Sequence, residues 1–350
     1  MLYGETGEEG VHGTLTVYYG TDEKRMSLAA GYARIERRMN ASGKVTRESY
    51  YDAGGNRTQT ADGYDEIRNL YDDQGNVIQI MYCTDGEMKN NADGVAVVRR
   101  QYDDRGLIVA EWYLNEERRP TAHLKNKYQR VEKTCLDADH VTSEAWFDPW
   151  GRPFAPDDTY VRIEREFDRR GNTVEERYYG TDGEPVPCRA GYDMLKREYN
   201  KKDQESRNAY YLDNGPFLLK KGYAAKTMEY DEAGNVCAER YYDREGRPVS
   251  CTGGYAGIRK EYNENREVVR EFYLDSEGQP AVNSKGICQT AYEYDEKGRV
   301  IREHYYDAQG QPMLCTGGYC AVIRTYDEEG KAAGEEYQMP DGSIWNKITN

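Results

Sequence analysis

Short segments in which polar and apolar residues alternate, separated by turns, recur along the whole chain. In VIREHYY and AVIRTY, branched, aromatic and charged residues exchange every one or two positions. A period of two is typical of β-strands. No stretch sustains an apolar face at helical spacing beyond about two turns. The pattern therefore favours strands throughout.

The turns between these segments share one chemistry. DEKG, DAQG and DEEG begin with Asp and end with Gly. An Asp side chain bonds the nearby backbone, and Gly supplies the positive φ angle that a tight turn needs. Each copy of the pattern therefore predicts a β-hairpin followed by a short extended piece that contains a Pro step.

Three landmarks recur with a common period of about 32 residues. The second member of an aromatic pair, or its variant, stands at Tyr19, Tyr51, Tyr82, Tyr113, Phe147, Tyr179, Tyr211, Tyr242, Tyr273 and Tyr306. A Gly-Tyr step stands at Tyr32, Tyr64, Tyr192, Tyr223, Tyr255 and Tyr319, with Val95, Tyr128, Tyr160 and Ile287 as equivalents. A Tyr-Asp or Tyr-Asn step stands at Tyr71, Tyr102, Tyr199, Tyr230, Tyr262, Tyr294 and Tyr326, with Met39, Leu136 and Phe167 as variants. Three landmarks with one period indicate ten tandem copies.

One hairpin of this kind is marginal in water, whereas stacked hairpins cover each other's aromatic faces. The sequence therefore predicts an all-β fold, an elongated solenoid-like array of about ten β-hairpin repeats of about 32 residues. We expect a lead-in or cap over residues 1–17, a single repeat array over 18–336 and a C-terminal cap over 337–350. The fourth copy, which contains His123 and His140, is the most divergent. Either a bend or specialised site lies there, or this copy has drifted.

The composition explains how such a polar chain can fold. Hydrophobic residues make up 37 % of the chain and charged residues 32 %, while Tyr outnumbers Phe by 33 to 5. Tyr rings bury apolar area while their hydroxyls reach solvent or a backbone partner, which suits a shallow core. The net charge of −15 argues against a nucleic-acid or anionic-membrane binder. No apolar run is long enough to predict a transmembrane helix.

The sequence lacks the common motifs of catalysis and metal binding. It has no nucleophile elbow, phosphate-binding loop, dinucleotide-binding loop or zinc-protease motif. The Asp-rich turns lack the ligand spacing of an EF-hand. We therefore expect no enzyme activity, no cofactor and no metal site. Eight Cys without a C-x-x-C pair predict free thiols, although Cys188, Cys251 and Cys315 share one repeat position and Cys288 and Cys320 share another.

The recurrent tyrosines are the candidates for a function. Sugars and cationic groups bind flat aromatic faces, and a repeat presents such faces at regular spacing. The tyrosines that follow open loops such as CTGG are expected to be exposed and to bind a ligand: Tyr192, Tyr223, Tyr255 and Tyr319. The Tyr-Asp tyrosines stand at strand ends beside turns and are expected in the core. If both sets are buried, the tyrosines serve packing alone.

The units YDEAGNVCAERYYDREGRPV and YDEKGRVIREHYYDAQGQPM resemble the YD repeats of bacterial RHS-type proteins. RHS proteins wind such repeats into a large β-shell that can enclose a toxin, so the resemblance implies a β-strand spiral. This double unit is longer and more regular than a simple YD repeat, and the chain is short for a full shell. The segment FDPWGRP, from Phe147 to Pro153, resembles the Asp-Pro-x-Gly that closes an RHS core. It stands where other copies have their second turn, so we interpret it as a Pro-bearing turn.

The units YYDAQGQP and YYGTDGEP are also similar to the aromatic hairpin repeats of bacterial choline- and glucan-binding modules. In those families, aromatic side chains of adjacent hairpins form ligand cages, although the repeat is shorter. This resemblance implies binding at the aromatic positions and nothing more specific.

Two functional hypotheses follow. The first is a non-catalytic module that binds a glycan or cell-wall polymer through recurrent exposed Tyr, since tethered weak sites gain avidity. The alternative is a structural spacer, or a protein-interaction or shell fragment of a larger RHS-like or polymer-modifying bacterial protein, with other domains as partners. Neither involves nucleic acid or membrane insertion. The compartment stays open: the resemblance favours the bacterial cell surface or the extracellular space. Free cysteines and the absence of a signal peptide favour the cytoplasm.

Overall fold

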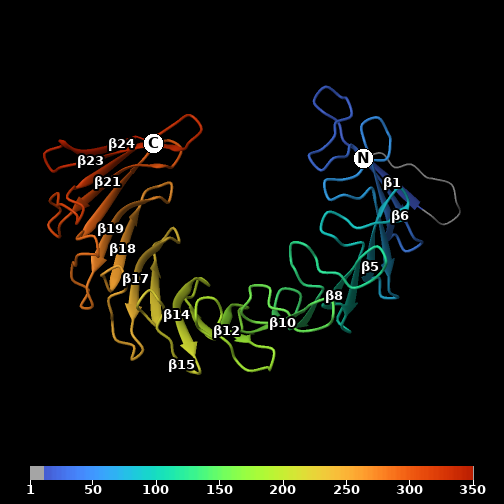
Figure 1. Ribbon diagram of the computed structural model, residues 1–350, viewed down its shortest axis with the longest axis horizontal. Helices are drawn as coiled ribbons and strands as arrows, with labels where there is room; N and C mark the ends of the chain where they lie inside the picture. Colours follow the sequence, from blue (N-terminus) through green and yellow to red (C-terminus); the bar gives the residue numbers. More distant parts are fainter. Residues whose placement is uncertain (1–11, 350) are drawn as a thin grey trace. The chain divides into compact units, whose positions relative to one another are not determined.

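A computed structural model describes residues 12–349 of the chain (Figure 1). The described residues form 24 strands and contain no helix, which confirms the all-β prediction. The chain divides into two compact units. Unit 1 comprises the residues up to Phe167 together with Arg177–Val186, and unit 2 comprises Asp168–Glu176 and the residues from Pro187 onward.

The strands follow one another in chain order. In unit 1 they are β1 (His12–Val17), β2 (Arg34–Met39), β3 (Val45–Tyr51), β4 (Glu66–Tyr71), β5 (Val77–Thr84), β6 (Glu87–Met88), β7 (Val97–Tyr102), β8 (Ile108–Leu114), β9 (Arg130–Cys135), β10 (Val141–Phe147) and β11 (Arg162–Phe167). Strand β12 (Thr173–Tyr179) contributes residues to both units. In unit 2 they are β13 (Met194–Tyr199), β14 (Glu205–Leu212), β15 (Gly215–Pro216), β16 (Ala225–Tyr230), β17 (Val236–Tyr242), β18 (Gly257–Tyr262), β19 (Val268–Leu274), β20 (Gln289–Tyr294), β21 (Val300–Tyr306), β22 (Ala321–Tyr326), β23 (Ala332–Gln338) and β24 (Ile344–Thr349).

Consecutive long strands pair antiparallel, so each repeat is a hairpin whose second strand pairs with the next hairpin. In the hairpin β16–β17, Met228 faces Glu239, and β17 in turn pairs with β18. A one-residue register shift before Tyr230 places this residue opposite Val236. The same shift precedes the last residue of β4 and of β18. The Tyr of each Tyr-Asp step therefore occupies a β-bulge beside the turn.

Asp-to-Gly turns close many of the hairpins as the sequence predicts, whereas the β18–β19 turn has Asn263 and Arg266 in these places. Asp231 N–H donates to the carbonyl of Asn235 at 3.0 Å, and its carboxylate accepts the Asn235 N–H at 2.8 Å. Gly234 has a φ of 87°. The local carboxylate and the left-handed glycine thus satisfy the backbone of the turn.

The Pro step forms the short extended piece that the sequence predicts. Tyr242 makes an isolated antiparallel bridge with Pro248, and corresponding bridges recur at Pro120, Pro153, Pro185, Pro280 and Pro312. Pro153 belongs to the FDPWGRP segment, so this segment takes the place of an ordinary second turn.

The loops that carry the Gly-Tyr step are joined from one repeat to the next by backbone hydrogen bonds. Thr252 N–H donates to the carbonyl of Lys221 at 2.9 Å, and Ser284 N–H donates to that of Gly253 at 2.7 Å. Gly254 has a φ of 85°, and a Cβ at this position would lie 2.8 Å from the Ser284 nitrogen. Both the conformation and the close approach of two backbones require glycine there.

The residues expected to form caps contain strands of the same pattern. Strand β1 pairs with β2, and β24 pairs with β23. The first eleven residues of the expected lead-in and the last residue of the C-terminal cap lie outside the described residues. The division into caps and a single array stays a prediction.

Candidate functional site

A ladder of packed aromatic rings follows the sheet in each unit. Rings of the Gly-Tyr step alternate with rings of the aromatic pair, and neighbouring centroids lie 4.7–6.3 Å apart. Aromatic pairs attract at such distances. In unit 2 the ladder contains Tyr192, Tyr210, Tyr223, Tyr241, Tyr255 and Tyr273, and then Tyr305, Tyr319, Tyr337 and Trp345. In unit 1 it contains Tyr18, Tyr32, Tyr50, Tyr64 and Tyr82, then Tyr113 and Tyr128, and then Trp146, Tyr160 and Tyr178.

The first member of the aromatic pair enters the ladder. Three residues that the sequence pattern suggested as second members occupy this first position instead: Tyr82, Tyr113 and Tyr273. Tyr82 faces Ile67 across its hairpin. Tyr50 faces Ile35 in the same way. Counted by structure, the ladder residue recurs every 31 to 33 residues, because packing against the adjacent strand fixes its register.

In several copies, a glutamate two residues before the ladder ring accepts a hydrogen bond from that ring's hydroxyl. The pairs in unit 2 are Tyr241–Glu239 at 3.2 Å, Tyr273–Glu271 at 3.1 Å, Tyr305–Glu303 at 3.1 Å and Tyr337–Glu335 at 2.6 Å. Burial, together with the nearby Cys251 and Glu271, raises the pKa of Tyr255 to about 12. The ladder thus combines ring faces with a row of carboxylates.

The unit 2 ladder is interrupted at Ile287, which stands where other copies have the Gly-Tyr tyrosine. A hollow of about 310 Å³ lies at this interruption. Ring residues Tyr255, Tyr273 and Tyr305 line it, together with Ile287. Its polar lining includes Glu239, Glu271, Glu303, Lys260 and Tyr292. We take this hollow as the candidate site, because it combines aromatic rings, carboxylates and space.

Two further departures from the repeat coincide with the hollow. Thr290 faces Tyr305 across the hairpin, where most copies have Ile, Leu or Val. Tyr292 faces Glu303, where most copies have Arg or Lys. Both residues line the hollow. Three departures from the repeat in one copy, at Ile287, Thr290 and Tyr292, therefore all lie at the hollow.

The predicted ligand-binding tyrosines are ladder residues. Tyr223 is only 6 % exposed, and Tyr192, Tyr255 and Tyr319 are half-buried. The prediction that this set is exposed is therefore wrong, because these rings pack against neighbouring ladder rings, as Tyr223 does against Tyr210 and Tyr241. Tyr255 alone of the four lines the hollow. Whether any of them binds a ligand stays a prediction.

Sequence reasoning did not single out Ile287, Glu271 or Tyr292. Ile287 was recognised only as an equivalent of the Gly-Tyr tyrosine. The signal that could have found the site is the coincidence of three departures from the repeat within six residues of one copy.

The Tyr-Asp tyrosines join each repeat to the preceding one. Their hydroxyls donate to a backbone carbonyl at the start of the preceding hairpin's second strand, as in Tyr262 to Val236 at 2.8 Å and Tyr294 to Val268 at 2.7 Å. Burial raises the pKa of Tyr262 and of Tyr294. These residues are half-buried and lie outside the buried core, so the expectation that they form the core is wrong; their hydroxyls bind the backbone instead.

In the divergent fourth copy, Cys135 takes the place of this tyrosine. The sequence pattern assigned the place to Leu136, but Cys135 faces Val141 in the register where Tyr102 faces Ile108. A hollow of about 390 Å³ opens beside Cys135. The Cys135 thiol lies 3.8 Å from the carbonyl of Ile108, which corresponds to the acceptor used by tyrosine in other copies.

Cys135→Tyr should therefore stabilise the protein by about 1 kcal/mol, because the ring fills the hollow and its hydroxyl reaches the Ile108 carbonyl. Urea unfolding followed by circular dichroism measures the change. Cys135→Phe is the control and should gain less, since it lacks the hydroxyl. A loss of stability in both variants would show that the hollow does not accept the ring.

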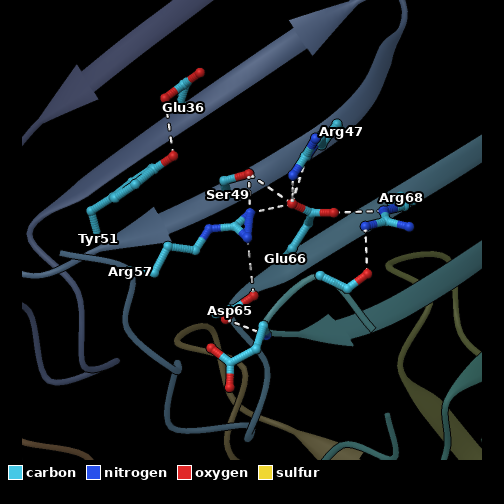
Figure 2. Close-up of polar contacts among 10 residues, drawn as sticks. Glu36, Arg47, Ser49, Tyr51, Arg57, Asp65, Glu66 and Arg68 are labelled. Atoms are coloured by element: carbon cyan, nitrogen blue, oxygen red, sulfur yellow. Dashed lines mark hydrogen bonds and ion pairs between the residues drawn. The ribbon is translucent and has the colours of Figure 1, made fainter. Parts of the chain in front are cut away.

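A buried charge cluster in unit 1 centres on Glu66, which is 0 % exposed (Figure 2). Its carboxylate accepts hydrogen bonds from Arg47 and Arg68 at 2.5 Å, from Arg57, and from the Ser49 hydroxyl at 3.2 Å. Burial alone would raise the pKa of Glu66, but the hydrogen bonds and charges of the arginines outweigh it and lower the pKa. The cluster is internally satisfied, so we interpret it as structural.

Other chemistry is sparse in the part of the chain that the structure describes. The eight cysteines are free thiols. Across residues 12–349, no group of three or more His, Cys, Asp or Glu residues is arranged to hold a metal ion. The same residues form no helix that is long and apolar enough to cross a membrane.

Neither a family model nor a curated protein matches the sequence. Several solved structures are similar. The Tc holotoxin pore of Photorhabdus luminescens is 13 % identical, with 89 % of this chain and 17 % of that chain covered and a TM-score of 0.33. The TcdB2-TccC3 structure is 12 % identical, with 97 % of this chain and 18 % of that chain covered and a TM-score of 0.31. A porin-like protein from Bacteroides uniformis is 11 % identical, with both chains fully covered and a TM-score of 0.23.

The chain spans less than a fifth of the length of the two toxin chains. At these identities and TM-scores, the similarities carry no conclusion about what the chain does. The β-hairpin repeat fold implied by the resemblance to YD repeats is confirmed by the strand pairing itself. No finding supports the resemblance to choline- and glucan-binding repeats. The chain is thus a tandem β-hairpin repeat protein.

Proposed function

We propose that the chain is a non-catalytic repeat module of a larger protein, in which it serves as a spacer, a shell fragment or a surface for neighbouring domains. The observation that carries this proposal is that the recurrent tyrosines make contacts within the repeat array itself. The ladder rings pack against each other, and the Tyr-Asp hydroxyls bind backbone carbonyls. The repeated tyrosines therefore serve to build the sheet and to join one repeat to the next.

The charged residues of the ladder face support the same role. Glu239, Glu271 and Glu303 each form an ion pair, with Lys226 at 3.7 Å, Lys260 at 3.7 Å and Arg324 at 2.5 Å respectively. Paired charges and packed rings suit a scaffold that keeps its form in water.

An antibody raised against the repeats tests this role in the source organism. The module should be detected in a polypeptide, or in a stable complex, larger than this chain alone. Gel filtration of a native extract followed by denaturing electrophoresis distinguishes the two. Detection of a free monomer of this chain would contradict the proposal.

Binding of a glycan or cell-wall polymer through recurrent Tyr is the second candidate function, favoured by the glutamate that accepts a hydrogen bond from several ladder rings, such as Tyr241 and Tyr273. An array of glycans, teichoic-type polymers and choline tests it with the purified protein. Binding that weakens stepwise as terminal repeats are deleted would support multivalent docking. No binding by a folded, β-rich protein would exclude it.

A further inference from the structure

We propose that the hollow at Ile287 is a binding site for a single pyranose sugar residue. The proposal is independent of the scaffold role, since it concerns one copy of the repeat and not the shared pattern. The hollow lies within unit 2, between the loop that carries Tyr255 and the hairpin β20–β21.

The missing ladder ring explains the shape of the hollow. The tilted rings of Tyr255 and Tyr273 pack at 4.9 Å on one side of the interruption, and those of Tyr305 and Tyr319 pack at 6.0 Å on the other. Ile287 is only 1 % exposed and belongs to one buried cluster with Tyr273 and Tyr305, but its side chain is smaller than the tyrosine ring of other copies. The hollow of about 310 Å³ is at the small end of ligand pockets, so it suits one ring-sized ligand. Such a ligand would occupy the place of a ladder ring, against neighbouring aromatic side chains.

The polar lining offers both acceptors and donors. The Glu271 carboxylate accepts the hydroxyls of Tyr273 at 3.1 Å and of Tyr292 at 2.9 Å. Lys260 and the side chain of Asn283 supply donors, and Glu303 supplies a second carboxylate. Polar side chains make up most of the lining beside the tyrosine rings, and fixed polar groups orient a ligand by hydrogen bonds. A sugar ring presents hydroxyls to such groups and C–H faces to the aromatic rings.

The charge balance favours a neutral sugar over an organic cation. Each of the three glutamates that line the hollow already has a cationic partner: Lys226, Lys260 and Arg324. An additional cation would compete with these side chains and gain little. Sugar hydroxyls can use the remaining carboxylate lone pairs without breaking an ion pair.

The departures from the repeat indicate a specialised place. Val95 also replaces a Gly-Tyr tyrosine, but its copy keeps the apolar Val98 and the basic Arg100. Val95 is 1 % exposed and packs against Val98 and Tyr113. In the copy that contains Ile287, Thr290 stands at the apolar position and Tyr292 at the basic position. Only this copy therefore replaces all three positions together.

Saturation-transfer NMR and titration calorimetry on the full chain test the site. The probes are methyl β-glucopyranoside, methyl β-galactopyranoside and the methyl glycoside of N-acetylglucosamine, with choline chloride as the cationic comparison. We expect at least one glycoside to bind at a single site, with a dissociation constant on the order of 1 mM. Ile287→Tyr restores the ladder ring, fills the hollow and should weaken binding at least tenfold.

Two further variants keep the test decisive. Glu271→Gln preserves the shape of the hollow, and we expect binding at least tenfold weaker, because the carboxylate is lost. Tyr64→Ile is the control, because it removes a ladder ring in unit 1. The positions equivalent to Thr290 and Tyr292 are Ile67 and Asn69 there, so binding should stay as in the parent protein. Circular dichroism confirms folding of each variant. The proposal is overturned if no glycoside binds the folded parent protein, if Ile287→Tyr binds equally well, or if choline binds and the glycosides do not.

Discussion

Replacing Tyr241 by alanine lowers the free energy of unfolding by about 4 kcal/mol, the range for removing a buried aromatic ring. Tyr241 is 7 % exposed and stacks on Tyr223 at 4.8 Å. It also packs against Tyr255 at 5.9 Å, so its loss opens a cavity between two repeats. Urea unfolding followed by circular dichroism measures the change. Because repeats are stabilised by their neighbours, the transition should also become less cooperative.

Two matched variants separate the ring from its hydroxyl and from general effects of the substitution. Tyr241→Phe keeps the stacking and loses the bond to Glu239, so its cost should be about 1 kcal/mol. Tyr19→Ala removes a ring that is 52 % exposed and should cost about 0.5 kcal/mol or less. Equal losses for Tyr241→Ala and Tyr19→Ala would show that the ladder does not stabilise the fold.

Glu66→Gln should destabilise the protein by about 3 kcal/mol at neutral pH, because three arginines lose the buried carboxylate that they share. This is the low end of the range for a broken buried pair. The side chains of Arg47, Arg57 and Arg68 are 36, 26 and 38 % exposed, so water takes over part of the lost interaction. The surface variant Glu329→Gln, in a pair with Lys331 that is about three-quarters exposed, should change stability by less than about 1 kcal/mol.

The effect of Glu66→Gln should depend on pH. The pKa of Glu66 is lowered in the folded protein, so the unfolded chain binds a proton first as the pH falls. The contribution of the carboxylate is therefore complete above the ordinary Glu pKa of about 4.3 and declines as the pH falls through the lower folded pKa. Denaturant titrations from pH 7 to pH 2 should show the parent and the variant converging in acid. A constant difference over this range would contradict a role for the charge.

The repeat and its strands could be predicted from the sequence because they depend on local rules. Alternation sets strands, and an Asp followed by a Gly sets a turn, as at Asp231 and Gly234. The side of the sheet on which a Tyr lies was harder to predict. A one-residue change of register moves a side chain to the opposite face, so Tyr82 and Tyr51, which the sequence pattern treats as equivalent, occupy different places.

The candidate site could not be predicted, because it depends on the absence of a ring. Tyr255 was selected by its loop, yet its exposure is set by Tyr241 and Tyr273 on either side. The Glu66 cluster was also hidden, since Arg47, Arg57 and Arg68 come from three segments of two repeats. Such contacts follow from pairing between hairpins, which a single repeat does not reveal.

The strand pairing has a consequence for how the chain folds during synthesis. Among the described residues, the contacting strands are neighbours in the chain. The exceptions are β5 with β7 and β14 with β16, which pair across the two-residue strands β6 and β15. Sequence separations between contacts are therefore short, and all-β folds are slow chiefly where their contacts are distant. Each hairpin needs only the one before it as a template. At ordinary translation rates a new repeat leaves the ribosome about every 2–6 s, ample time for a hairpin to add to the growing edge. The repeats can thus fold one after another in the order in which they are synthesised.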